Sequence, residues 1–128
     1  MSVVTASERL SAAFEARDLA AALACFVPGD DIGYAGSEQS EQATGRDGVA
    51  ALLTTVFARD EAYSWRVTTA MVREYGTAAY LYAQADGLVH SDVGEAVPFA
   101  YRISGVLEPL AGQWLWRHCY GCEPTRDA

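Results

Sequence analysis

The chain has 128 residues and a formal net charge of −8, and its nine basic residues are all arginine. This length fits one domain, and an acidic chain with scattered arginines is a poor match to a nucleic-acid backbone. The absence of lysine excludes Schiff-base chemistry and a lysine-dependent phosphate loop from this chain alone.

The sequence also lacks the signals of membrane insertion and secretion. No segment reaches 18 consecutive apolar residues, and the N-terminus has no basic region followed by an apolar run. The three cysteines, Cys25, Cys119 and Cys122, are an odd number and imply no disulfide framework. We therefore expect a protein of the reducing cytoplasm that makes no contact with membranes.

The first third of the chain predicts two helices and a strand. Apolar residues recur at helical spacing within residues 6–16, and Asp18 is a typical N-cap for a second helix over residues 19–26. Residues 30–36 predict a short strand. The polar residues 37–44 predict an exposed loop or a small hairpin.

A third helix and four long strands complete the predicted elements. The segment Gly45-Arg46-Asp47-Gly48 opens a helix whose apolar residues share one stripe. From Tyr63 onward the period changes to two, which predicts strands over residues 65–75, 77–87, 97–107 and 113–122. Helices first and strands after are typical of an α+β domain, with helices on one face of an antiparallel, strongly curved sheet.

The last predicted strand carries the most distinctive pattern in the chain. Side chains alternate between faces along a strand, so one face should carry Trp114, Trp116, His118, Tyr120 and Cys122. Large aromatic residues and one imidazole on a single face indicate either the lining of a cavity or an ordinary core layer.

Several short motifs follow one another in a recognisable order. They are Asp18-Leu19 leading through Cys25-Phe26 to Asp30-Asp31, the helix opening at residues 45–49, Tyr101-Arg102-Ile103-Ser104, Gly112-Gln113-Trp114, and the ending from His118 to Pro124. Together they resemble the SnoaL-like group of the nuclear-transport-factor-2-like (ketosteroid-isomerase-like) superfamily. Tyr120 and Cys122 depart from a His-x-His-x-Ser-x-Pro ending.

The resemblance implies a cone-shaped α+β fold in which a curved antiparallel sheet wraps around a helix (a cystatin-like or SnoaL-like fold). It also implies an apolar pocket at one end and a homodimer that pairs through the outer face of the sheet. The steroid-isomerase members use a carboxylate base and a phenol that stabilises an oxyanion. Gly36 and Leu10 stand at the matching positions, so we exclude steroid-type isomerisation.

His118 is the best single candidate for chemistry, because an imidazole titrates near neutrality and can act as general acid or base. The carboxylate of Asp30 or Asp31 could orient it, as is usual for a base in proton transfer. The alternative is a histidine that is hydrogen-bonded within the sheet, beside aspartates that form a solvated turn or helix cap.

Seven further residues are candidates for contact with a ligand. The aromatic ones could line a pocket, with the core or a dimer interface as the alternative; they are Tyr34, Trp65, Tyr82, Tyr101, Trp116 and Tyr120. Arg102 either anchors an anionic group or forms a structural ion pair with Glu74, Asp86 or Glu95.

We expect no metal and no cofactor. Cys119 and Cys122 are three residues apart on one strand and therefore face opposite sides, which prevents them from holding one ion together. No phosphate loop, dinucleotide fingerprint or zinc-protease helix appears in the sequence.

Two functions remain open for this single SnoaL-like domain of residues 1–128. One is a small-molecule-binding protein, with the option of cofactor-free isomerase or cyclase chemistry in secondary metabolism through His118. The other is a non-catalytic dimerisation or interaction module whose pocket is filled by its own side chains. The expected partners are a small apolar or aromatic molecule and a second copy of the chain.

Overall fold

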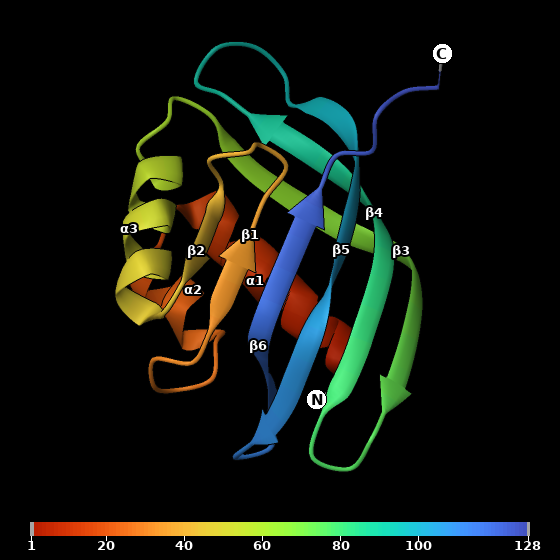
Figure 1. The fold of residues 1–128 in the computed structure, drawn as a ribbon. Coiled ribbons are helices and arrows are strands. Elements are labelled where there is room, and N and C mark those ends of the chain that lie inside the picture. Colours follow the sequence, from red (N-terminus) through yellow and green to blue (C-terminus); the bar gives the residue numbers. More distant parts are fainter. Residues whose placement is uncertain (1, 128) are drawn as a thin grey trace.

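A computed structural model describes residues 2–127 as helices packed on a six-stranded sheet (Figure 1). The helices are α1 (Val3–Ala16), α2 (Leu19–Ala24) and α3 (Arg46–Phe57). The strands are β1 (Gly33–Ala35), β2 (Gln42–Thr44), β3 (Ala62–Glu74), β4 (Ala79–His90), β5 (Val97–Leu110) and β6 (Gln113–Cys122). The predicted α+β fold is confirmed, and the polar residues 37–44 belong to a small β1–β2 hairpin.

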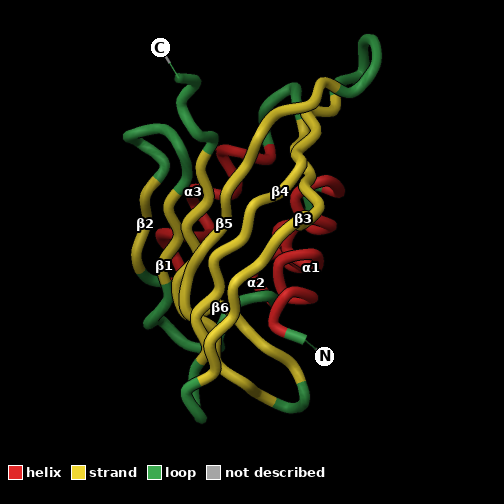
Figure 2. The backbone as a smooth tube through the Cα atoms, turned by 90° about the vertical axis from the view of Figure 1, so that its right-hand side faces the viewer, coloured by secondary structure: helices red, strands yellow, loops and turns green. Residues whose placement is uncertain are grey.

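The strand order in the sheet is β2-β1-β6-β5-β4-β3. All neighbouring strands are antiparallel except β1 and β6, which run parallel, so the sheet is mixed rather than purely antiparallel. The helices lie on one face of this curved, unclosed sheet, and the other face of the long strands carries no helix (Figures 1 and 2). In residues 2–127 no helix has the length and apolar character needed to cross a membrane.

The core lies between α1 and the inner face of the sheet. The helical stripe of α1 buries Leu10 and Phe14, and the small inner residues of β4 let the helix approach closely. Those small residues are Ala79, Ala83 and Ala85. On the outer face, Tyr80 is exposed and Tyr82 is partly buried.

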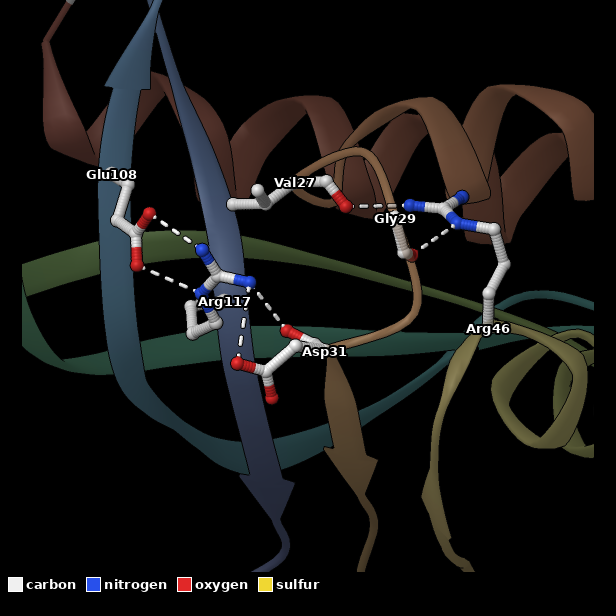
Figure 3. A network of polar contacts seen from close by, with 6 residues as sticks. All are labelled: Val27, Gly29, Asp31, Arg46, Glu108 and Arg117. Carbon is white, nitrogen blue, oxygen red and sulfur yellow. Dashed lines mark hydrogen bonds and ion pairs between the residues drawn. The ribbon is translucent and has the colours of Figure 1, made fainter.

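Arg46 ties α3 to the connection between α2 and β1. The residue before the helix, Gly45, has a φ of 82° and no side chain, so Asp30 acts as the cap by accepting a hydrogen bond from the Arg46 backbone N–H at 2.9 Å. The Arg46 guanidinium donates to the carbonyl oxygens of Val27 at 2.6 Å and Gly29 at 2.8 Å (Figure 3). The Gly-Arg motif therefore has a structural role here.

An irregularity in β6 changes which side chains face inward. Val106 pairs with His118 and Leu107 pairs with Trp116, so Arg117 is an extra residue on β6. Its guanidinium is held by both carboxylate oxygens of Glu108, at 2.8 and 2.7 Å, and by the carbonyl of Asp31 at 2.6 Å (Figure 3).

The predicted alternation along β6 is therefore wrong beyond Trp116. Trp116 is fully buried, and its indole N–H donates to the carbonyl of Ala6 at 3.4 Å. After the bulge, His118 and Tyr120 point to the exposed outer face, while Cys119 and Gly121 point inward. One extra residue moves every later side chain to the opposite face.

Candidate functional site

A partly enclosed cavity lies at the end of the sheet where β1 and β6 finish and β5 begins. Its volume is about 110 Å³. The aromatic and apolar residues of its lining are Phe14, Tyr34, Val56, Tyr63, Trp65, Val89, Phe99 and Tyr101. The other lining residues are Gly36, Ser37, Glu38, Glu41, Arg59, Gly121 and Glu123. Of these, Ser37, Glu38 and Glu123 are exposed and mark the mouth of the cavity. We call it the aromatic cavity.

The aromatic rings of the cavity pack against one another. Phe14 meets Trp65 edge-on with ring centroids 5.2 Å apart, and Trp65 lies 5.0 Å from Tyr101. Phe99 completes the row at 5.7 Å from Tyr101. These are ordinary contact distances for aromatic pairs, so mutual packing of the rings holds this wall of the cavity in place.

Two buried serines of α1 fix the position of Trp65. The Ser11 hydroxyl donates to the Trp65 carbonyl at 2.8 Å and accepts from its backbone N–H at 2.7 Å. The Ser7 hydroxyl accepts from the Trp65 indole N–H at 3.0 Å. The sequence analysis missed both serines, although two serines four residues apart on the apolar face of a helix are a visible signal.

The phenols of Tyr34 and Tyr101 interact inside the cavity. Burial raises the pKa of Tyr34, and the nearby Cys119 and Glu41 add to this effect. Burial likewise raises the pKa of Tyr101, with a further contribution from Tyr34. Both groups therefore stay protonated at neutral pH and can donate a hydrogen bond.

Gly121 makes room for the Tyr101 hydroxyl. A β-carbon at Gly121 would overlap the phenol oxygen of Tyr101. The two residues lie on the neighbouring strands β6 and β5, on the inner face of the sheet. The glycine thus lets the tyrosine extend across its neighbouring strand and present its hydroxyl to the cavity.

A charged group closes part of the mouth of the cavity. Arg59, just after α3, lies 3.2 Å from Glu41 and 3.9 Å from Glu38, both in the β1–β2 hairpin. Glu41 Oε1 also accepts from the Glu38 backbone N–H at 2.9 Å. The hairpin is tied to the end of β6, because the Glu123 backbone N–H donates to the Ser37 hydroxyl at 2.8 Å.

Comparison with known protein families identifies the family of this chain. The SnoaL-like domain matches residues 3–120. The chain belongs to the SnoaL-like domain family. The resemblance seen in the motifs is confirmed, and the cavity lies between the helices and the inner face of a SnoaL-like sheet.

Solved structures of the superfamily share this fold. A "putative dehydratase from the NTF2-like family" of Streptomyces avermitilis is 16% identical, with a TM-score of 0.78 over 97% of this chain and 94% of that one. An NTF2-like superfamily protein from Salmonella enterica is 14% identical, with a TM-score of 0.78 over 98% and 91%. A Nostoc punctiforme protein of unknown function with a cystatin-like fold is 12% identical, with a TM-score of 0.75 over 95% and 88%.

These similarities establish the fold and not the activity. A search among curated protein sequences finds no significant match to this SnoaL-like chain. The functional argument therefore depends on the side chains of the chain itself.

The structure brings together three of the predicted ligand-contacting residues and separates the others from them. Tyr34, Trp65 and Tyr101 line the aromatic cavity. Tyr82, Tyr120 and Arg102 lie on the outer face of the sheet, and Trp116 is buried in the core.

Arg102 does not form the predicted structural ion pair. In register it is flanked by Gln84 on β4 and Cys122 on β6. No salt bridge joins it to a carboxylate within residues 2–127. Its side chain is exposed, so the carboxylates suggested from the sequence are not its partners.

A second, open hollow lies at the start of β1, and its lining includes Asp30, Asp31 and His118. Asp30 caps α3, and Asp31 Oδ2 lies 3.8 Å from Arg117 Nη1. The His118 ring covers Gly33, where a β-carbon would come within 2.7 Å of Cδ2. The three predicted residues are thus neighbours, but they do not line the aromatic cavity, and no ion pair links His118 to either aspartate in the described part of the chain.

Gly36 and Leu10 stand at the positions that the resemblance matches to the catalytic base and phenol of the steroid isomerases. Gly36 lines the cavity mouth, and the Glu41 side chain lies where a side chain at position 36 would project. Leu10 is fully buried in the core. Neither residue provides the base or the phenol of a steroid isomerase.

The cysteines remain separate from the cavity lining. Burial raises the pKa of Cys25 and of Cys119, which disfavours the reactive thiolate. Cys122 is partly buried and also unpaired with another cysteine in the structure. Across residues 2–127 no group of three or more potential metal ligands converges.

A second polar cluster, which the sequence analysis missed, joins α1 to β3 and β4. His90 Nε2 lies 2.8 Å from the Ser64 hydroxyl and 3.7 Å from Glu15 Oε1. A catalytic triad needs the serine on one ring nitrogen and the carboxylate on the other. Both partners approach the same nitrogen here, so this cluster does not have the geometry of a nucleophilic site.

Proposed function

We propose that this SnoaL-like protein binds a small aromatic or otherwise apolar molecule with a hydroxyl or carbonyl oxygen in the aromatic cavity. The observation that carries the proposal is the pair of protonated phenols, Tyr34 and Tyr101, in the lining of a cavity walled by aromatic rings. Apolar walls with a few converging polar groups are typical of small-molecule sites.

The size of the cavity limits the ligand. An apolar cavity of roughly 150 Å³ can hold benzene. The aromatic cavity, at about 110 Å³, is smaller and is open on one side. It therefore admits no more than a single ring or an apolar group of similar size, seated against Trp65 and Tyr101, and any larger part of the ligand lies at the mouth.

The phenol pair also indicates which chemistry the cavity would favour. A hydroxyl donor placed at a substrate oxygen stabilises negative charge that develops there. Such stabilisation suits proton transfer next to a carbonyl or the loss of water, and dehydratase names occur among the similar structures. Proton-accepting groups on this cavity are the carboxylates of Glu38, Glu41 and Glu123 at its mouth.

An acid–base role of His118 would require a substrate that binds outside the aromatic cavity. The imidazole shares its hollow with Asp30 and Asp31 and not with the aromatic rings. We therefore separate the two proposals: ligand binding is assigned to the aromatic cavity, and a His118-dependent reaction would need a substrate on the open hollow.

A thermal-shift screen with small phenols and aryl ketones tests the proposed function. We expect stabilisation of the wild type and a smaller shift for Tyr101→Phe and Tyr34→Phe. Tyr82→Phe is the control: it also removes one phenol hydroxyl, but from the outer face of the sheet, and it should behave like the wild type. Equal shifts for all three variants would remove the phenol pair from the site.

We also propose that the outer face of the sheet pairs with a second copy of the chain. This face carries no helix (Figure 2) and exposes Met71, Tyr80, Val106 and Tyr120 on four neighbouring strands. A contiguous apolar surface of this kind commonly marks an interaction site. The expected assembly is a homodimer.

A further inference from the structure

We propose that the ligand of the aromatic cavity carries a positively charged amine at its outer end. This inference rests on the proposed function and adds the chemical class of the ligand: an apolar ring that fits the cavity, with a cation at the mouth. It follows from the balance of charge around the opening, from the state of Arg59 and from the aromatic walls.

The mouth of the cavity has an excess of negative charge. Three glutamates, Glu38, Glu41 and Glu123, and one arginine, Arg59, are among its lining residues. Two negative charges are therefore left uncompensated at the opening. Inside the cavity, the buried Tyr34 and its neighbour Tyr101 are neutral donors, so the charge on the lining is concentrated at the mouth.

The positive charge of Arg59 is already shared by two carboxylates, which approach one of its nitrogens. Glu41, whose side chain is only 12% exposed, lies 3.2 Å from the guanidinium, and Glu38 lies at 3.9 Å on the same nitrogen. Burial, the largest single effect, lowers the pKa of Arg59, but Tyr63 and both glutamates together outweigh it and raise the pKa. An incoming carboxylate would have to share this guanidinium with both glutamates and would be repelled by their negative charges.

The aromatic walls favour a cation over an anion as well. The face of an aromatic ring attracts an ammonium group within about 6 Å and repels an anion. Tyr63 and Phe99 are partly exposed lining residues, so an amine near the mouth would have aromatic rings and acidic residues within reach. The net charge of −8 on the whole chain adds a weaker, longer-range attraction.

Three probes that share one phenol ring test the inference by calorimetric titration. They are tyramine, which is cationic, para-ethylphenol, which is neutral, and para-hydroxyphenylpropionate, which is anionic. We expect tyramine to bind up to about 5-fold more tightly than para-ethylphenol, given that an exposed charge pair contributes about 0.2–1 kcal/mol. The anionic probe should bind most weakly, and added salt should reduce the differences.

Charge variants at the mouth should change the ratio of tyramine affinity to para-ethylphenol affinity in opposite directions. Glu38→Gln and Glu123→Gln should lower the ratio, and Arg59→Gln should raise it. The neutral probe reports whether each variant keeps an intact cavity, so a loss of structure would not be mistaken for a change in selectivity.

The outcomes distinguish this inference from the proposed function. If all three probes bind equally, or if the anionic probe binds most tightly, the cationic ligand class is overturned while binding to the cavity stands. If none binds, or if binding is unaffected by Tyr101→Phe and Tyr34→Phe, the proposed function fails and this inference fails with it.

Discussion

The hydroxyl of Tyr101 lies directly over Gly121, in space that a β-carbon on the neighbouring strand would fill. This relationship lets a tyrosine from β5 reach across β6 and present a buried phenol beside Tyr34. The aromatic cavity therefore depends on a residue with no side chain as well as on the aromatic residues themselves.

Gly121→Ala should displace the Tyr101 ring and weaken ligand binding. Overpacking at a buried site typically costs about 1–3 kcal/mol, so the free energy of unfolding in urea should fall by a similar amount. Gly48→Ala in α3 is the matched control, because the new β-carbon would lie at an ordinary contact distance of 3.6 Å from Ala43 Cβ. The control should be neutral or more stable, as alanine favours a helix. A Gly121→Ala variant as stable as the wild type would contradict the proposed close contact.

Ser11→Ala should destabilise the protein through Trp65. The substitution removes the hydroxyl that satisfies both the backbone N–H and the carbonyl of Trp65, and a buried polar group left without a partner costs about 1–3 kcal/mol. Chemical denaturation checks this, with the exposed Ser40→Ala as control. A change no larger than that of the control would show that the serine does not hold the strand.

The ion pair at the β6 bulge should make stability depend on pH in the acid range. Hydrogen bonding to Arg117 lowers the pKa of Glu108 below its ordinary value of 4.5. A lowered folded-state pKa stabilises the fold above 4.5, and this contribution is lost as pH falls through the folded-state pKa. Glu108→Gln should therefore flatten the pH dependence of the unfolding midpoint below about 4.5. An unchanged acid slope would contradict this role.

Substitution of an exposed aromatic residue on the outer face should prevent dimer formation. Tyr120 is 43% exposed on β6, and a charged side chain there would have to be desolvated in a sheet-to-sheet contact. Light scattering at tens of micromolar should give a dimer mass for the wild type and a monomer mass for Tyr120→Arg. A monomeric wild type would count against the interface.

The order of elements was predictable because local periodicity determines it. Helical spacing identified α1 and α3, and alternation identified β3 to β6, with ends that differ by a few residues. The inward direction of β6 side chains was not predictable, since the extra residue Arg117 depends on pairing with β5 and on a close approach at Gly105. A β-carbon at Gly105 would overlap the backbone oxygen of His118.

The cavity was only partly predictable from the sequence. The six aromatic residues proposed as pocket walls included Tyr34, Trp65 and Tyr101, which line the cavity, but also Tyr82, Trp116 and Tyr120, which do not. The charged mouth was missed: Arg59 and Glu41 lie in separate connections that meet only through the packing of α3 against the β1–β2 hairpin.

The position of a bound phenol tests the central claim most directly. A crystal structure of the protein with para-bromophenol would locate the bromine through its anomalous scattering. We predict the phenol ring in the aromatic cavity, against Trp65 and Tyr101, with its hydroxyl within hydrogen-bonding distance of the Tyr34 and Tyr101 oxygens. A ring bound only in the hollow beside His118, or only on the outer face near Tyr82, would contradict this account of the aromatic cavity.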